Sequence, residues 1–286
     1  MRITDIINGE KPSLSFEVFP PKTTDKIEDV MAVTEKIATL NPSYMSVTYG
    51  AGGGTSLYTR DVASRVLSLG VTPLAHLTCI SSTKAEVRAL LSDLKARGIN
   101  NILALRGDIP ADMVNAPREY KYAYELIREI KEAGDFTVGG ACYPEGHPES
   151  ENGERDIESL KIKVDAGCEF LTTQMFFDNN ILYNFLWRLS RRGVNVPVVA
   201  GIMPVTNVAQ IKRLVAISGN QLPQRFIRLV DRYGDDPRAM KQAGIAYATE
   251  QIIDLFANGV NAVHIYSMNK PDVAEKIKEN LSEIIR

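Results

Sequence analysis

Short apolar runs recur along the chain at steps of about thirty residues, and this spacing limits the possible folds more than any other feature. Most of these runs lack polar alternation, which is typical of parallel strands buried on both faces. The expected strands cover 14–19, 44–48, 71–77, 102–105, 136–142, 170–174, 196–201 and 262–266. A step of this length holds one strand and one helix, so the spacing predicts a repeated strand–helix unit.

A segment with helical periodicity follows each expected strand. These segments cover 26–40, 56–69, 83–97, 120–133, 156–166, 180–192, 208–217, 237–258 and 271–285, with an extra helix over 223–233. The pattern predicts an α/β fold, an eight-stranded parallel (β/α)8 TIM barrel with an extra helix before the last strand. An open doubly wound sheet is the alternative. No Pro- or Gly-rich linker divides the chain, so we expect a single catalytic barrel domain over 1–286, in which a short polar lead comes before the first strand.

Composition excludes several classes of partner. The net charge is −2, so the chain has no basic excess for binding nucleic acid. No apolar run approaches the roughly 20 residues of a membrane-spanning helix, and the first residues lack the apolar core of a signal peptide. We therefore expect a cytoplasmic protein. Cys79, Cys142 and Cys168 are too sparse for a disulfide framework, and no ligand set has zinc spacing, so we expect no metal.

Polar side chains stand near the carboxyl ends of seven expected strands, where barrel enzymes carry their chemistry. They are Glu17, Thr48, His76, Arg106 with Asp108, Tyr143 with His147, Gln174 and Tyr266. Glu17 has apolar neighbours, and burial in the barrel mouth would raise its pKa and make it a proton donor near neutral pH. A solvated or structurally paired carboxylate is the alternative.

Three further patterns bear on ligand binding. The strand over 102–105 leads directly into Arg106-Gly107-Asp108, which suggests a site, with a surface turn as the alternative. The glycine run 50–54 could approach a phosphate, but it matches neither G-x-G-x-x-G nor a P-loop, and a flexible turn is the alternative. Phe176 and Phe177 could stack on a flat ring, or they could be core. No lysine stands at an inward strand end, which disfavours Schiff-base chemistry.

An ordered set of motifs resembles bacterial methylenetetrahydrofolate reductases. The motifs are SFEVFPP at 15–21, SVTYG at 46–50, HLTC at 76–79, LRGD at 105–108, YPEGHP at 143–148, KVDAG at 163–167 and TQMFFD at 173–178. The resemblance implies a noncovalent flavin at the barrel mouth, FAD rather than FMN. The implied cofactor-binding residues are Thr48, His76, Arg106, Gly107, Asp108, Tyr122, Ala123, Tyr143, His147, Asp156 and Lys163, with Arg106, His147 and Lys163 near the diphosphate or ribose.

The resemblance also implies a reaction in two halves. NADH or NADPH reduces the flavin and leaves, and 5,10-methylenetetrahydrofolate then takes its place and becomes 5-methyltetrahydrofolate. Glu17 would help to protonate N10 of the folate, and Asp108 would stabilise the cation that forms. Gln174, Gln210 and Lys270 would contact the substrate. A homo-oligomer is expected for such an enzyme.

The chain departs from the family pattern at two positions. Leu214 stands where the family often has a stacking Phe, so stacking would fall to Phe176, Phe177 or Tyr183. Lys270 stands where some members have an Arg, so binding of the folate tail would be looser. One alternative is therefore a flavin- or folate-binding barrel subunit that receives electrons from a partner protein. A barrel lyase without redox chemistry is a further alternative.

Overall fold

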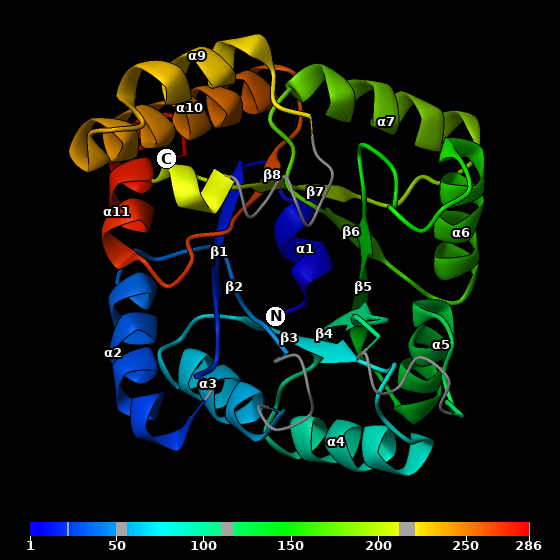
Figure 1. Ribbon diagram of the computed structural model, residues 1–286. Helices are drawn as coiled ribbons and strands as arrows, with labels where there is room; N and C mark the ends of the chain where they lie inside the picture. Colours follow the sequence, from blue (N-terminus) through cyan, green and yellow to red (C-terminus); the bar gives the residue numbers. More distant parts are fainter. Residues whose placement is uncertain (22, 50–55, 110–116, 212–220, 286) are drawn as a thin grey trace.

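The described residues form a closed barrel of eight parallel strands (Figure 1). The structure is a computed structural model that describes residues 1–21, 23–49, 56–109, 117–211 and 221–285. The strands are β1 Ser13–Val18, β2 Met45–Val47, β3 Pro73–Thr78, β4 Asn101–Leu105, β5 Thr137–Cys142, β6 Phe170–Thr173, β7 Val198–Ile202 and β8 Ala262–Ile265. Neighbours in the chain pair in parallel, and β8 closes the ring against β1. The predicted barrel is confirmed, and the open sheet is excluded.

Helices surround the strands (Figure 1). They are α2 Ile27–Ala38, α3 Ser56–Ser68, α4 Lys84–Ala96, α5 Ala123–Ala133, α6 Gly153–Asp165, α7 Asn179–Arg191, α9 Gln224–Tyr233, α10 Pro237–Ala257 and α11 Pro271–Asn280, with a 3-10 turn, η1, at Thr24–Lys26. The extra helix predicted over 223–233 is α9, which packs against α10. Of the helix predicted over 208–217, residues 208–211 are helical and the rest lies outside the described residues. No helix in the described ranges is both long and apolar enough to cross a membrane.

Side-chain caps fix where several helices begin. Thr83 and Glu86 form a capping box at α4, in which the Thr83 hydroxyl accepts from the Glu86 N–H and the Glu86 carboxylate accepts from the Thr83 N–H. Asn152 caps α6 in a similar way, and Asp236 caps α10 just before Pro237. Such caps satisfy backbone N–H groups that have no partner within the helix. They set the point at which the chain leaves the barrel mouth and turns into the outer layer.

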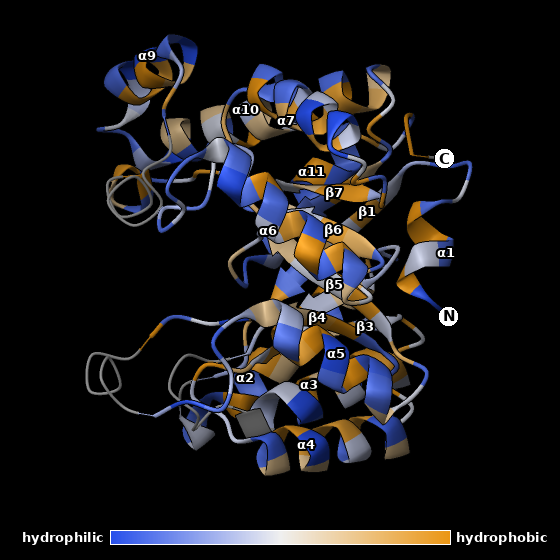
Figure 2. Cartoon of the chain, turned by 90° about the vertical axis from the view of Figure 1, so that its right-hand side faces the viewer, coloured by the Kyte–Doolittle hydropathy of each residue, from blue (hydrophilic) through white to orange (hydrophobic). Residues whose placement is uncertain are grey.

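The segment before β1 contains a helix that the sequence pattern does not predict. Where a polar lead was expected, α1 spans Ile3–Ile7 and lies inside the ring of strands, at one end of the barrel (Figures 1 and 2). Ile3 and Ile7 are one turn apart, and both are buried. The N–H of Ile3 donates to Oδ1 of Asn101, the first residue of β4, at 2.9 Å. The helix thus covers the amino ends of the strands, because its apolar side has nowhere else to be buried.

Small and large residues interlock inside the barrel, so that the interior is packed near α1 and hollow near the mouth. Gly139 on β5 is the register partner of Phe170 on β6, and a Cβ at position 139 would lie 2.3 Å from the Phe170 ring. Phe170 belongs to the cluster that α1 covers, together with Tyr44, Leu74 and Leu103. The last three also line the cavity at the mouth, so this cavity extends down to the layer above α1.

Candidate active site

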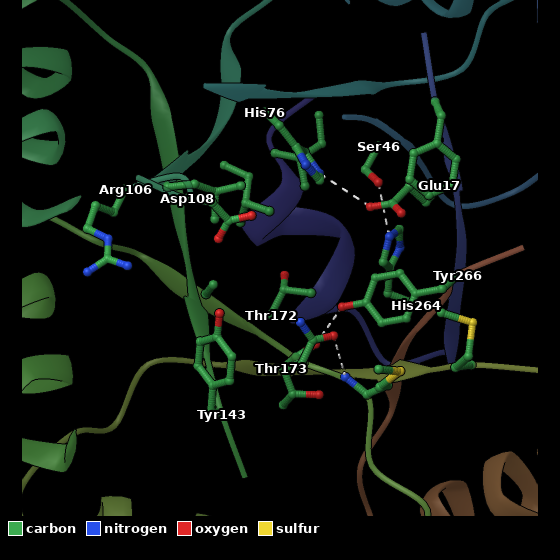
Figure 3. A pocket seen from close by; sticks show the side chains of 18 of the residues that line it. Glu17, Ser46, His76, Arg106, Asp108, Tyr143, Thr172, Thr173, His264 and Tyr266 are labelled. Atoms are coloured by element: carbon green, nitrogen blue, oxygen red, sulfur yellow. Dashed lines mark hydrogen bonds and ion pairs between the residues drawn. The ribbon is translucent and has the colours of Figure 1, made fainter. Parts of the chain in front are cut away.

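A cavity of about 540 Å³ opens at the carboxyl ends of the strands. A volume of this size is in the range of ligand pockets, which is roughly 300–1,000 Å³. Residues two apart on a strand face the same side, so the inward residues of β1 to β8 meet there. The lining includes Glu17, Tyr44, Ser46, Leu74, His76, Leu103, Arg106, Asp108, Ala141, Tyr143, His147, Glu149, Thr172, Thr173, Gln174, Met203, His264, Tyr266 and Met268 (Figure 3).

Glu17 is a buried acid in the wall of this cavity. Its side chain comes from β1 and is 5% exposed, and burial raises its pKa to about 8. His76 on β3 faces it, with Nε2 3.9 Å from Glu17 Oε2. Burial lowers the pKa of His76 to about 3, so this ring is neutral at pH 7 and gives Glu17 no positive charge. Glu17 therefore keeps its proton at neutral pH and can donate it to a basic atom in the cavity.

Three buried polar atoms of the wall have no hydrogen-bond partner within the described chain. They are Oη of Tyr44, Nε2 of His76 and Oγ1 of Thr172, and each belongs to a residue that lines the cavity. An unsatisfied buried polar group is costly, and proteins usually satisfy such groups with water or with a ligand. The cavity is thus suited to a ligand that can form several hydrogen bonds with its wall.

His264 on β8 lies next to Glu17 and was not predicted as a site residue. Its Nδ1 is 2.8 Å from Oγ of Ser15, and its Nε2 is 3.0 Å from Oγ of Ser46. Burial lowers its pKa to about 3, which makes this ring neutral as well. The Tyr266 hydroxyl donates to the Thr173 carbonyl at 2.6 Å, on the other side of His264. Serine and histidine side chains therefore form a fixed polar layer beneath the acid.

Arg106 and Asp108 follow β4 at the rim of the cavity. Gly107 between them has φ +85°, a conformation that favours glycine, and this allows the chain to turn at the strand end. The Arg106 guanidinium donates to both carboxylate oxygens of Glu149, with Nη2 2.7 Å from Oε1, and this pair raises the pKa of Arg106. Asp108 and Glu17 point into one cavity, so the two predicted catalytic carboxyl groups share a site (Figure 3).

Tyr143 and His147 stand at the rim after β5. The two rings meet edge to face with centroids 4.6 Å apart. Nδ1 of His147 accepts from the N–H of Glu149 at 3.1 Å, so Nε2 of the neutral ring carries the proton. Burial and the positive charge of Arg106 lower the pKa of His147. His147 can thus act as a neutral hydrogen-bond donor beside a cation.

The predicted site residues fall into two groups. Glu17, His76, Arg106, Asp108, Tyr143, His147 and Gln174 line the cavity. Thr48, Gly107, Tyr122, Ala123, Asp156, Lys163, Gln210 and Lys270 are not in its lining. Lys163 lies behind β5, where its Nζ donates to the carbonyl of Ala141 at 2.8 Å, and burial lowers its pKa. Burial raises the pKa of Asp156 nearby. Tyr122 is 56% exposed and stacks on Tyr124.

Two predicted substrate-binding residues meet at Thr206, after β7. The Lys270 ammonium donates to Thr206 Oγ1 at 2.8 Å, and the Thr206 N–H donates to Gln210 Oε1 at 3.1 Å. This grouping joins the β7 and β8 sides of the mouth. Gln174 stands apart from it, and its Oε1 accepts from the N–H of Met175 at 3.0 Å.

The expected stacking partners are wrong. Phe176 and Phe177 are fully buried, and Phe177 packs against Phe226 of α9 with ring centroids 5.1 Å apart. Tyr183 lies on α7, where its hydroxyl donates to Asp254. None of these three rings lines the cavity. The extra helix covers Phe177, which the local sequence does not reveal. Pro110, Leu214 and the glycine run 50–54 lie outside the described residues.

Tyr44, Ser46 and His264 of the cavity wall and Ser15 behind it were not predicted, although a simple pattern connects them. Ser15 and Glu17, Tyr44 and Ser46, and His264 and Tyr266 are pairs two residues apart, so each pair faces the same side of its strand. On these three strands the second polar residue of the wall could have been found two positions from the first. Glu149 carries no comparable signal, because its contact with Arg106 joins two loops. In the described part of the chain, no group of three His, Cys, Asp or Glu side chains could hold a metal ion.

Comparison with known proteins gives consistent matches. The sequence profile described as methylenetetrahydrofolate reductase matches residues 2–282. The 5,10-methylenetetrahydrofolate reductases of Pectobacterium carotovorum subsp. carotovorum and Escherichia coli strain K12 are each 33% identical over 270 residues, which is 94% of this chain and 90% of theirs. Methylenetetrahydrofolate reductase (NADH) 1 of Arabidopsis thaliana is 32% identical over 298 residues, and the match covers 99% of this chain and 50% of that protein.

The fold also matches a solved structure. A protein from Clostridium thermocellum, which binds two copies of 5-methyl-5,6,7,8-tetrahydrofolic acid, superposes with a TM-score of 0.71. The match covers 98% of this chain and 99% of that one, at 14% sequence identity. At this identity the likeness supports the barrel architecture and no more.

Proposed function

Because the chain belongs to the methylenetetrahydrofolate reductase family, we propose that it reduces 5,10-methylenetetrahydrofolate to 5-methyltetrahydrofolate through a bound flavin, with NADH or NADPH as the electron donor. The two substrates would take turns at the cavity. We further propose that residues 1–286 act as one catalytic barrel. The observation that carries the proposal is the position of Glu17, a buried acid that keeps its proton at neutral pH and shares a cavity with Asp108.

We infer that the flavin is FAD rather than FMN and that it binds at this cavity. Arg106 and His147 offer donors at the rim, where a diphosphate could bind. Inside the cavity, His76 Nε2 and Thr172 Oγ1 are buried and without partners, as expected for atoms that a polar ring would satisfy. The residues proposed to hold the flavin are Thr48, His76, Arg106, Gly107, Asp108, Tyr122, Ala123, Tyr143, His147, Asp156 and Lys163. When bound, the flavin would supply the hydride chemistry.

The protein would contribute proton transfer and charge. Glu17 would donate its proton to N10 of the folate, which opens the five-membered ring and leaves a cation on the substrate. Asp108 would stabilise this cation, because a carboxylate about 4 Å from a positive charge is worth about 4 kcal/mol at an effective dielectric constant near 20. Gln174, Gln210 and Lys270 would orient the substrate. Burial of Glu17 keeps the proton available until a basic atom approaches.

Separate measurement of the two half-reactions tests this proposal. Glu17→Gln keeps the size of the side chain and removes the acid. We expect it to retain flavin reduction by the nicotinamide and to lose folate reduction by several orders of magnitude. Glu10→Gln is the matched control, because Glu10 is an exposed glutamate just before β1. Equal losses in both half-reactions would contradict the role of Glu17 as the acid.

A variant of the second carboxylate tests the electrostatic part. We expect Asp108→Asn to bind flavin with a raised midpoint potential, because a nearby negative charge favours the oxidised form. An unchanged potential would contradict this role. Bleaching of the purified flavoprotein by NADH or NADPH alone would also separate the proposed enzyme from a subunit that receives electrons from a partner protein.

A further inference from the structure

A chain of hydrogen bonds runs across three neighbouring strands beneath Glu17. Ser15 on β1, His264 on β8 and Ser46 on β2 are connected through the two ring nitrogens of His264, at 2.8 and 3.0 Å. Ser15 also donates to the carbonyl of Val263 at 3.1 Å. Ser15 and His264 are register partners in the ladder between β1 and β8, and Glu17 and Ser46 are partners between β1 and β2.

One arrangement of protons satisfies all three of these hydrogen bonds at once. A carbonyl oxygen can only accept, so the single hydroxyl proton of Ser15 points to Val263. Nδ1 of His264 must then carry a proton and donate it to Ser15. Because the buried ring is neutral, Nε2 has no proton and must accept from Ser46. The hydroxyl of Ser46 thus donates to the ring and has only lone pairs left for its other neighbour.

That other neighbour is Glu17, which is the register partner of Ser46 on the adjacent strand and lines the same cavity (Figure 3). We propose that Ser46, held by His264, is a positioning residue that favours the protonated form of Glu17, because it faces the carboxyl group only as a hydrogen-bond acceptor. A protonated carboxyl can donate to this oxygen, whereas a carboxylate would meet its lone pairs. The inference rests on the proposed role of Glu17 as the acid and adds the group that keeps its proton in place.

The other groups around Glu17 do not oppose this effect. His76 approaches from β3 at 3.9 Å and is neutral. Tyr266 approaches from β8, and its hydroxyl proton points to the Thr173 carbonyl. Arg106 on the β4 side of the cavity is paired with Glu149. The described wall therefore offers Glu17 no unpaired cation that would favour the carboxylate.

The first test measures the tautomer of His264 without any assay of activity. The chain has three histidines, so ¹⁵N-labelled histidine gives a short set of ring signals. His76→Gln and His147→Gln identify the signals of the other two rings. We expect His264 to be the neutral Nδ1–H tautomer at pH 7 in the full chain. An Nε2–H tautomer or a charged ring would overturn the proposal.

The second test follows the protonation of Glu17 itself. Infrared difference spectra of each variant against its own Glu17→Gln version show the carbonyl band of the protonated carboxyl group as pH is raised. We expect Ser46→Ala to lower the midpoint of this titration by about one pH unit, the size expected for one hydrogen bond. Ser46→Thr, which keeps the hydroxyl, should restore it. Ser13→Ala is the matched control, because Ser13 is a buried serine of β1, the strand of Glu17, and its hydroxyl has no hydrogen-bond partner among the described residues.

A double variant shows whether His264 acts through Ser46. His264→Phe keeps an aromatic ring against Tyr44 and frees the Ser46 proton, so it should lower the Glu17 midpoint by at least as much as Ser46→Ala. In the Ser46→Ala background, His264→Phe should not shift the Glu17 midpoint further. A further shift would contradict the proposal that His264 acts through Ser46. An unchanged midpoint in Ser46→Ala would overturn the proposal even if Glu17→Gln still abolished folate reduction. If Ser46→Ala shifts the midpoint but Glu17→Gln still reduces the folate normally, the proposed function is refuted instead.

Discussion

Replacement of Glu17 by glutamine should change how the stability of the folded chain depends on pH. The glutamine has nearly the same size and occupies the same place on β1, but it carries no ionisable proton. In the folded chain burial raises the pKa of Glu17 to about 8, from an ordinary value of 4.5. The folded chain therefore keeps a proton over a range of pH in which the unfolded chain has lost it.

The sign and size of the effect follow from this difference. Stability is lost with rising pH wherever the folded state binds more protons than the unfolded state. Between pH 4.5 and about 8, Glu17 destabilises the wild type by about 1.4 kcal/mol for each pH unit. Over the whole range this amounts to about 5 kcal/mol, and above the folded pKa it changes no further. Glu17→Gln lacks this loss, so its free energy of unfolding relative to that of the wild type should increase with pH.

Urea unfolding followed by circular dichroism measures the difference. Between about pH 5.5 and about pH 8, the free energy of unfolding of Glu17→Gln minus that of the wild type should rise by about 3 kcal/mol. Any constant cost of the amide cancels from this slope. Glu10→Gln should show no such rise, because Glu10 is exposed. Parallel pH profiles for the wild type and Glu17→Gln would refute the burial of an ionisable group at this position.

Three further substitutions test other parts of the structure. Gly107→Ala forces a side chain into φ +85° and puts a Cβ 3.0 Å from Thr78 Cβ, so urea unfolding should show a loss of about 1–3 kcal/mol, and wild-type stability would contradict the loop geometry. Ile3→Ala should cost about 2–5 kcal/mol in the same assay while leaving the activity of the folded enzyme intact; a cost below 1 kcal/mol would show that α1 does not cover the barrel. Lys270→Met should raise KM for the folate with little change in kcat, as expected for a residue that binds substrate without taking part in the chemistry, and a fall in kcat alone would contradict that role.

The barrel could be predicted because its main signal is local. Each strand is a short apolar run followed by a helical segment, and these units recur in order. The polar strand ends could be found for the same reason, and Glu17 stood out as an acid between Phe16 and Val18. The contacts of these residues depend on which strands become neighbours, and that is decided by closure of the ring.

The missed features all depend on contacts between distant segments. Ser15 and His264 are 249 residues apart in the chain, and each stands locally as a polar residue between two apolar ones. The helix α1 has only five residues, too few for a periodic pattern, and its partner Asn101 lies 98 residues away. Phe177 was expected at the site because it follows Gln174, but α9 covers it from a position about fifty residues later in the chain.

The closed end formed by α1 determines how reactants can move. In the part of the barrel that the structure describes, the cavity around Glu17 is closed at its base by the first helix. A molecule at the base must leave through the mouth by which it entered, and a second molecule can occupy the same place only afterwards. The closed base would therefore impose sequential binding on any two reactants that both need to reach Glu17.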